Sequence, residues 1–480
     1  MTDVVFCIIP KIEPQAPTSG VAVLKQVCMN AGYTSTVVDF NIDLYNYLKQ
    51  QNLHEKYWHD DDSLFLNHGE LEHNPDWIDF VQVHGEIIDL WIERLRELEP
   101  RYIGLSLLTM YSKSCAITLA QRIRQHLPNS KIIWGGPPVD RYFSDCLIEN
   151  NLADHYVIGD GEIAILNILR EGTVKQSSQN LNISDLPFPN YDDINWEQYE
   201  QGEDNADKKV AYVTASRGCI KRCTFCNVRD IWPSYLSRPG VQVAEEIKFL
   251  SDAYGRLSIK FTDSLINGSM RDYRELIQQL IEYKDSDQLP EELGWTSQWI
   301  VRSQQRTQEQ DFADAHLANC IDLEIGIEHF SESVRWHMGK KFTDEDMWFT
   351  FEMMTRHKIP SSILMIVGYP TETEQDHQTQ LRTLEEIFRR GYVYNQQKGK
   401  GHQVMHFTAT PMLLDGEIYK MVKDDLEYYN NERDWKLGDN DTQTRMRRYS
   451  EFQEKLQQLQ GTDWEWSANK ELRVYANAQV

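Results

Sequence analysis

The chain has 480 residues, of which 74 are acidic and 49 are basic, so its formal net charge is −25. This balance argues against a protein whose main partner is nucleic acid, because phosphate binding depends on clustered lysine and arginine side chains. The hydrophobic fraction of 41% and the charged fraction of 26% are ordinary for a globular protein, and the length predicts about two to four domains.

The sequence has no feature typical of a membrane or secreted protein. Its longest apolar run, around Ile363 to Val367, is far shorter than the roughly 20 residues that cross a bilayer. The N-terminus has neither the basic region nor the small-residue cleavage site of a signal peptide. We therefore predict a cytoplasmic protein with no membrane and no nucleic-acid partner.

The first 170 residues alternate short β-rich runs with amphipathic stretches. This alternation predicts right-handed crossovers and a Rossmann-like, doubly wound parallel sheet that is covered on both faces. The expected strands are Val4 to Ile9, Thr36 to Phe40, Tyr102 to Leu108, Lys131 to Trp134 and His155 to Ile158. The expected helices are Ser19 to Ala31, Ser112 to His126 and Gly161 to Leu169.

Glycine-rich turns follow two of these strands. A ligand of such a sheet binds beyond the carboxyl ends of the strands, where glycine allows the backbone to approach it closely. Gly135 and Gly136 form one such turn, and Gly159 and Gly161 flank Asp160 in the other. These turns are as compatible with a nucleotide-like or tetrapyrrole ligand as with plain tight turns.

Two segments interrupt the alternation. Residues 51–100 hold 13 acidic and 3 basic side chains, so we predict a solvated acidic insertion that ends in an amphipathic helix around Trp91 to Arg96. Prolines and turn formers around Leu186-Pro187-Phe188-Pro189 place a domain linker at 171–208.

A second alternating series occupies residues 209–410. Its six β/α units fit a partial (β/α)6 TIM-type barrel, whose chemistry collects at the carboxyl ends of the strands. Residues 411–480 lose this order, and we predict a C-terminal helical extension that includes Tyr449 to Leu459. The expected strands are Ala211 to Ala215, Leu257 to Thr262, Gly294 to Ile300, Ile321 to Ile327, Ser362 to Val367 and Gln403 to Ala409. The expected helices are Val241 to Ala253, Tyr273 to Tyr283, Asp344 to His357 and Asp376 to Arg390.

The most informative motif is a cluster of three cysteines in the loop after the first barrel strand. Cys219, Cys223 and Cys226 have a Cys-x3-Cys-x2-Cys spacing and are surrounded by polar residues and glycine. Three close thiolates can hold three irons of a cubane [4Fe–4S] cluster and leave the fourth iron open to a chelating small molecule. A zinc site would need a fourth ligand, and no cysteine or histidine near the cluster is an obvious one.

This motif resembles the signature of the radical S-adenosylmethionine (radical SAM) enzymes, which carry an aromatic residue, here Phe225, before the last cysteine. The resemblance implies that the open iron binds S-adenosylmethionine. A reductant such as flavodoxin or ferredoxin would then supply the electron that cleaves it into methionine and a 5′-deoxyadenosyl radical. The protein must position that radical and exclude water.

The resemblance continues at the ends of later barrel strands. It makes Asp263 a candidate acceptor for the amino group of S-adenosylmethionine and Arg302 a candidate partner for its carboxylate. Glu328, in a Gly-Ile-Glu element, is a candidate ribose or methionine contact, although His329 replaces the serine that often follows it. Gly368 and Glu372 belong to a Gly-x-Pro-x-Glu element beside the adenine. For each of these residues a strand-end polar group satisfied by a neighbouring loop is an equally good interpretation.

The N-terminal domain resembles the cobalamin-binding domain of one large radical SAM subclass. The resemblance rests on the Trp134-Gly135-Gly136-Pro137 and Gly159-Asp160-Gly161-Glu162 turns and on Ala16 to Leu24. It implies that Gly135, Gly136, Gly159 and Gly161 contact cobalamin. The loop from Pro10 to Gly20 lacks the Asp-x-His-x-x-Gly motif, so the domain would hold cobalamin without a histidine on cobalt, or would hold nothing.

By resemblance the expected function is a cobalamin-dependent methyltransferase that methylates an unactivated carbon of a small-molecule or peptide substrate. A cyclase or ring-rearranging enzyme without net methyl transfer is an alternative on the same domain plan. Methylthio transfer to tRNA is a further alternative that would need a second cluster, for which Cys7, Cys28, Cys115 and Cys146 are available. Their positions within predicted strands and helices favour buried side chains instead.

Overall fold

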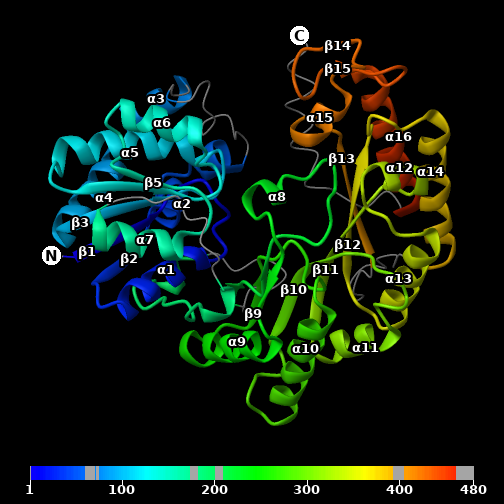
Figure 1. The fold of residues 1–480 in the computed structure, drawn as a ribbon, viewed down its shortest axis with the longest axis horizontal. Helices are drawn as coiled ribbons and strands as arrows, with labels where there is room; N and C mark the ends of the chain where they lie inside the picture. Colours follow the sequence, from blue (N-terminus) through cyan, green and yellow to red (C-terminus); the bar gives the residue numbers. More distant parts are fainter. Residues whose placement is uncertain are drawn as a thin grey trace. The chain divides into compact units, whose positions relative to one another are not determined.

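The computed structural model describes residues 2–59, 71, 75–172, 182–199, 209–392 and 405–460. The chain divides into two compact units, Met1–Tyr212 and Val213–Val480 (Figure 1). No helix within these described ranges is both long and apolar enough to cross a membrane.

The first unit is built on a five-stranded sheet with the order β2-β1-β3-β4-β5, in which every neighbouring pair is parallel. The strand order reverses between β1 and β3, and this switch point is where an open α/β sheet leaves its ligand crevice. All five expected strands are confirmed. They are β1 (Thr2–Ile8), β2 (Ser35–Asp39), β3 (Pro100–Ser106), β4 (Lys131–Gly135) and β5 (His155–Val157).

Helices cover both faces of this sheet, which confirms the doubly wound architecture. Val21 of α1 and Ile165 of α7 pack with Val4 and Phe6 on one face. On the other face Phe40 stacks on Trp91, with ring centroids 4.7 Å apart. The helices of the unit are α1 (Ser19–Asn30), α2 (Phe40–Gln50), α3 (Pro75–His84), α4 (Glu86–Leu98), α5 (Ser112–His126), α6 (Arg141–Glu149) and α7 (Gly161–Glu171).

The prediction of a solvated insertion at 51–100 is wrong for its second half. Residues 75–98 form α3 and α4, and these helices bury Trp77, Phe80 and Trp91 in the same core as β1. Their acidic residues lie on the outer faces, so the high charge density marks amphipathic helices and not a solvated loop. Residues 60–70 and 72–74 of the segment lie outside the described residues.

The described part of the expected linker, residues 182–199, is packed against the first unit. Tyr199 donates a 2.6 Å hydrogen bond to Asp39, and the Asp193 carboxylate accepts a 2.6 Å contact from the buried Lys25 ammonium. The remainder of the expected linker, at 173–181 and 200–208, lies outside the described residues. Residues 182–199 therefore belong physically to the first unit.

The second unit is built on a six-stranded sheet with the order β13-β12-β11-β10-β9-β6. The pairs from β9 to β13 are parallel, as a partial barrel requires. All six expected strands are confirmed. They are β6 (Val210–Val213), β9 (Ser258–Phe261), β10 (Gly294–Trp299), β11 (Cys320–Glu328), β12 (Ser361–Val367) and β13 (Met405–Pro411).

Helices connect these strands, and several start at clear N-caps. Thr373 and Asp376 form a capping box at the start of α14, and Thr343 and Asp346 form one at α13. The sequence predicted four of these helices and missed α11 and α12. The helices are α9 (Gly240–Tyr254), α10 (Met270–Asp285), α11 (Glu309–Leu317), α12 (Glu332–His337), α13 (Asp344–Arg356) and α14 (Glu374–Arg389).

The described C-terminal extension contains α15 (Gly416–Val422), α16 (Thr442–Gln460) and a small antiparallel pair, β14 (Tyr428–Tyr429) with β15 (Trp435–Lys436). The helical prediction is confirmed for α16, and the β14–β15 pair is an addition to it. Residues 461–480 lie outside the described residues.

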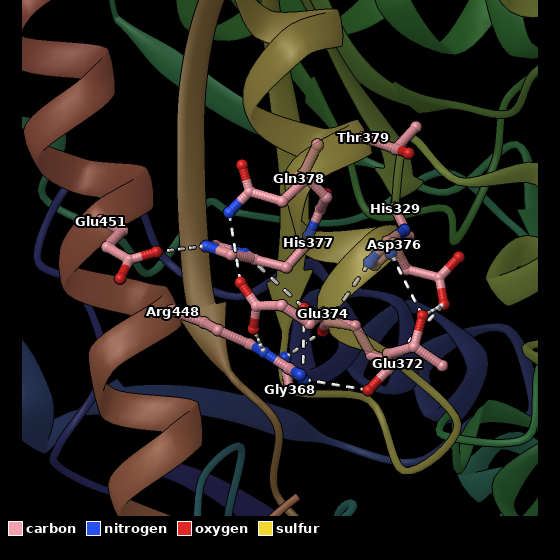
Figure 2. A network of polar contacts seen from close by, with 12 residues as sticks. His329, Gly368, Glu372, Glu374, Asp376, His377, Gln378, Thr379, Arg448 and Glu451 are labelled. Carbon is pink, nitrogen blue, oxygen red and sulfur yellow. Dashed lines mark hydrogen bonds and ion pairs between the residues drawn. The ribbon is translucent and has the colours of Figure 1, made fainter. Parts of the chain in front are cut away.

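A buried polar network attaches α16 to the barrel (Figure 2). The guanidinium of Arg448 donates a 3.0 Å hydrogen bond to the Glu372 carbonyl and lies 3.8 Å from the Glu372 carboxylate. His377, on α14, lies 2.9 Å from the Glu451 carboxylate of α16. The buried Glu372 carboxylate depends on Arg448 for compensation of its charge, whereas Arg448 also lies 3.4 Å from the exposed Glu374 carboxylate.

Arg448→Met should destabilise the second unit by about 3–5 kcal/mol, because it leaves the buried Glu372 carboxylate without its cation. Arg447→Met is the matched control, because Arg447 is the preceding residue of the same helix and its ion pairs with Glu374 and Glu451 are exposed. That control should cost less than about 1 kcal/mol. Urea unfolding measures the free energy of unfolding of both variants, and hydrogen exchange reports on the opening of α16. Equal losses of stability in the two variants would contradict the assignment of Arg448 as the compensating cation of Glu372.

Candidate active site

The three cysteines lie on the loop that follows β6, where the sequence placed them. The loop begins with β7 (Ser216–Arg217), which pairs with β8 (Leu236–Ser237), and it includes the short helix α8 (Val228–Ile231). Cys219 and Cys223 are half-buried and Cys226 is exposed. The loop that carries all three cysteines follows the carboxyl end of β6, the end of the sheet where barrel chemistry collects.

The residues after α12 and β12 hold this loop in place. The backbone N–H of Thr224 donates to the carbonyl of Met338 at 3.0 Å, and the Lys221 ammonium donates to the carbonyl of Lys340 at 3.0 Å. The hydroxyl oxygens of Thr224 and Tyr369 lie 2.9 Å apart. Three contacts from two other elements thus fix the middle of the cysteine loop.

A buried ion pair lies beside the cysteines. The Lys340 ammonium is 2.9 Å from the Glu328 carboxylate and donates a 3.0 Å hydrogen bond to the Gly326 carbonyl. A Cβ at position 326 would lie 2.6 Å from the Lys340 nitrogen and would also collide with the Glu328 carboxylate. The glycine of the Gly-Ile-Glu element is therefore required by the ion pair itself.

Glu328 has a left-handed backbone, with φ of 66°, at a register shift between β11 and β12. A residue with a side chain adopts this conformation only when its surroundings enforce it. Here the bend turns the carboxylate back over Gly326 and onto Lys340. The predicted ribose or methionine contact of Glu328 stays a prediction, and it would have to share this carboxylate with Lys340.

Lys340 is a site residue that the sequence did not single out. Burial acts against its charge, but Glu328 and the Cys223 thiol hold the pKa of Lys340 above its usual value. Burial raises the pKa of Cys219 and raises that of Cys223 to about 11, and the positive charge of Lys340 opposes the rise at both thiols. Lys340 therefore favours the thiolate forms that bind metal.

The donor set fits an iron–sulfur cluster. Within the described residues, no group of three or more His, Cys, Asp or Glu side chains is close enough to surround one metal ion. In a cubane cluster each cysteine binds a different iron, so its ligands stand further apart than those of a single ion. The three thiols share one loop and influence one another electrostatically, and Cys219, Cys223 and Cys226 remain our predicted ligands.

Asp263 is buried beneath the start of the cysteine loop. Its Oδ2 accepts a 2.9 Å hydrogen bond from the Ala215 N–H, and burial raises its pKa to about 7. Its Oδ1 has no hydrogen-bond partner among the described residues. A buried acceptor without a donor fits the predicted acceptor of an amino group, and this role stays a prediction.

The aromatic ring of Phe225 and the guanidinium of Arg302 are both engaged with protein atoms. Phe225 packs on an apolar cluster that includes Met338 and Tyr369, and the Lys340 ammonium lies 5.7 Å from its ring centroid. Arg302 donates to the carbonyls of Asn267 and Gly268 at 2.6 and 2.8 Å. The cofactor contacts of Phe225 and Arg302 stay predictions.

Gly368 and Glu372 are structural neighbours of the C-terminal extension (Figure 2). The Glu372 carboxylate accepts a 2.5 Å hydrogen bond from the Gly368 N–H and faces His329 and His377, each at 3.7 Å. A Cβ on Gly368, which has φ of +85°, would lie 2.5 Å from the Arg445 side chain. A larger residue at 368 would therefore disturb the extension, whether or not a cofactor binds there.

The four predicted glycines of the first unit lie at the carboxyl ends of β4 and β5. Gly135 ends β4 and Gly136 follows it, while Gly159 and Gly161 lie between β5 and α7. The loop after β3, which flanks the switch point of the sheet, exposes 49% of Leu108 and 56% of Met110. Exposed apolar side chains near these glycines fit a bulky, partly apolar ligand such as a corrinoid.

Comparison with known proteins identifies both units. Residues 213–383 match the radical SAM superfamily model, and residues 78–169 match the B12 binding domain model. The chain carries a radical SAM domain and a B12-binding domain. The B12 match begins within the segment that the sequence analysis assigned to an insertion, in agreement with the packing of α3 and α4.

Solved structures share the fold of both domains. The radical SAM methyltransferase TsrM from Kitasatospora setae aligns with a TM-score of 0.57 and 15% identity over 81% of this chain and 71% of that chain. The cobalamin-dependent radical SAM enzyme OxsB aligns with a TM-score of 0.61 and 16% identity over 95% of this chain and 62% of that chain.

Curated relatives match this chain over only part of their own length. A ribosomal protein uS12 methylthiotransferase of Thermotoga sp. is 25% identical over 56% of this chain and 60% of its own length. The anaerobic magnesium-protoporphyrin IX monomethyl ester cyclase of Synechocystis sp. is 23% identical over 56% of each chain. The match therefore spans less than two thirds of either relative.

Replacing any one of Cys219, Cys223 and Cys226 with alanine should remove most of the iron and sulfide bound after anaerobic reconstitution, because three-point ligation cannot survive the loss of one thiolate. Cys146→Ala, which removes a half-buried cysteine of the first unit, is the control and should keep the wild-type content. If a variant with all three cysteines replaced by alanine bound as much iron as the wild type, the cluster ligands would be other residues.

Lys340→Gln should lower the reduction potential of the reconstituted cluster by on the order of tens of millivolts, because a nearby positive charge favours the reduced form. Glu328→Gln should shift the potential in the opposite direction. An EPR-monitored redox titration measures both. If the ion pair were purely structural, the reduction potential would shift in the same direction in both variants or would not shift. Either result would refute the electrostatic role of Lys340 and Glu328.

Proposed function

We propose that this protein is a cobalamin-dependent radical SAM enzyme that methylates an unactivated carbon of a small-molecule or peptide substrate. The observation that carries the proposal is the presence, in one chain, of a three-cysteine loop after the first barrel strand and a B12-binding sheet with its own switch point. TsrM, whose solved structures include one with cobalamin and a [4Fe–4S] cluster, shares both parts of this plan.

The residues of the radical SAM domain divide the work of holding the cofactors. Cys219, Cys223 and Cys226 would hold the [4Fe–4S] cluster, and Lys340 would stabilise the charge of the thiolates. Asp263 offers a buried acceptor for the S-adenosylmethionine amino group. When bound, the cluster and S-adenosylmethionine supply a carbon-centred radical, and the protein keeps water away from it. A reductant such as flavodoxin or ferredoxin would deliver the electron.

The B12-binding domain would hold cobalamin at the carboxyl edge of its sheet. Gly135, Gly136, Gly159 and Gly161 keep that edge free of bulky side chains, and Leu108 and Met110 add apolar surface. The loop from Pro10 to Gly20 contains no histidine, so we infer that no imidazole from this loop binds cobalt.

The similarity to the Synechocystis cyclase favours one alternative, a radical cyclisation without net methyl transfer. The methylthiotransferase relatives suggest another. Cys7, Cys28 and Cys115 are fully buried, and burial raises the pKa of each thiol strongly, so these cysteines are poor ligands for a second cluster. The methylthiotransferase alternative is therefore the weaker one.

The products formed from S-adenosylmethionine separate these functions. Protein reconstituted anaerobically with iron, sulfide and hydroxocobalamin should bind about one corrinoid and, with a reductant, form 5′-deoxyadenosine. Methyl transfer should also yield S-adenosylhomocysteine, whereas a cyclase should yield none. Mass spectrometry and dialysis measure these quantities.

The controls assign each product to its cofactor. The cysteine-to-alanine variant should lose 5′-deoxyadenosine but keep corrinoid binding, because the two sites belong to different domains. Absence of corrinoid uptake by the wild-type protein would reduce the proposal to a cobalamin-independent radical reaction. Formation of 5′-deoxyadenosine without S-adenosylhomocysteine would favour the cyclase.

A further inference from the structure

The radical SAM domain contains an arginine-lined cleft, and one of its residues, Arg302, is also the predicted partner of the S-adenosylmethionine carboxylate. It has a volume of about 770 Å³ and lies between the start of α10 and the loop after β10, which are neighbours in Figure 1. No cysteine of the metal-binding loop lines it. Four of the nine residues that line it are arginines, namely Arg271, Arg274, Arg302 and Arg306.

The charge of the cleft is opposite to that of the chain. Glu275 is the only acidic residue in the lining, and Asp272 and Asp311 lie behind it as partners of Arg271 and Arg274. Counting all three acids against the four arginines leaves a local charge of +1, in a chain whose formal net charge is −25. Solubility alone does not explain a positively charged cleft in so acidic a chain.

Two of the arginines have no carboxylate partner among the described residues. Within the described residues the Arg302 guanidinium donates only to the carbonyls of Asn267 and Gly268, and both hydrogen bonds come from one nitrogen, Nη1. Arg306 is exposed, and its side chain makes no ion pair within the described ranges. Burial, together with the charges of Arg306 and Arg274, lowers the pKa of Arg302, which an anion in the cleft would reverse.

The cleft is preformed, because buried contacts fix both of its walls. The Asn267 side chain is fully buried, donates to the Ile300 carbonyl at 2.9 Å and accepts from the Ile300 N–H at 3.1 Å. Arg274 forms a two-point pair with Asp311, at 2.7 and 3.0 Å. Its guanidinium also donates to the Arg306 carbonyl at 3.1 Å, which ties the second loop to α10.

We propose that this cleft binds the phosphoryl group of a small anionic molecule. Guanidinium forks match phosphate oxygens with two hydrogen bonds each, and the cleft lies at the N-terminal turn of the 16-residue helix α10, whose dipole favours an anion. The cleft is open to solvent, and its volume is large enough for a small molecule. Two guanidinium groups without carboxylate partners favour a group with at least two negative charges.

Isothermal titration of the full-length protein with inorganic pyrophosphate tests the proposal. Arg306→Met should weaken binding by about tenfold or more, and Arg306→Lys, which keeps the charge but not the fork, should weaken it less. Arg389→Met is the matched control, because Arg389 is exposed and its partner Glu386 lies on α14, outside the cleft. It should bind pyrophosphate as the wild type does.

The possible outcomes are distinct. Wild-type affinity in Arg306→Met, or no binding of pyrophosphate, would overturn the proposal, and equal binding of citrate would overturn its assignment to phosphoryl groups. Arg306 is exposed, so thermal unfolding should show that its variants fold normally. The titration needs neither cluster nor corrinoid, so its result is independent of the proposed radical chemistry.

Discussion

The buried pair between Lys340 and Glu328 is the interaction on which the arrangement of the cysteine loop depends. A buried charge is tolerated only when an opposite charge compensates it. Glu328 provides this compensation by bending β11 into a left-handed conformation, and Gly326 leaves the space for it. The same segment that carries Lys340 also holds Lys221 and Thr224 by backbone carbonyls. One ion pair thus joins β11, the residues after α12 and the cysteine loop.

A second buried carboxylate performs the equivalent task after the neighbouring strand β12. Glu372 satisfies the Gly368 N–H at the end of β12 and, through Arg448, anchors α16. The glutamates of two sequence elements that resemble cofactor-binding motifs are therefore both engaged by protein partners. These motifs fix the shape of the strand ends first, and any cofactor contact is made by the surface that results.

Most of the fold could be predicted from the sequence, because the strands of its two parallel sheets are local β-rich runs with helices between them. The error at residues 75–98 arose because charge density hid the buried faces of α3 and α4. The cysteine loop was predictable from spacing alone. Lys340 was not, because its role comes from contacts with Glu328 and Cys223, which are distant in sequence. The arginine cleft was missed for the same reason, since its residues come from the start of α10 and from the loop after β10.

The distribution of charge in the second unit follows from these separate constraints. Around the cysteines, positive charge must offset thiolates in a half-buried site, and Lys340 and Lys221 are held there by carbonyls and one carboxylate. In the loop after β10, Arg302 and Arg306 have no carboxylate partner within the described ranges. A cation whose carboxylate partner belongs to the protein stabilises the fold, whereas one without such a partner remains available to a ligand. By this criterion Lys340 organises the site, and Arg302 and Arg306 of the cleft are available for recognition.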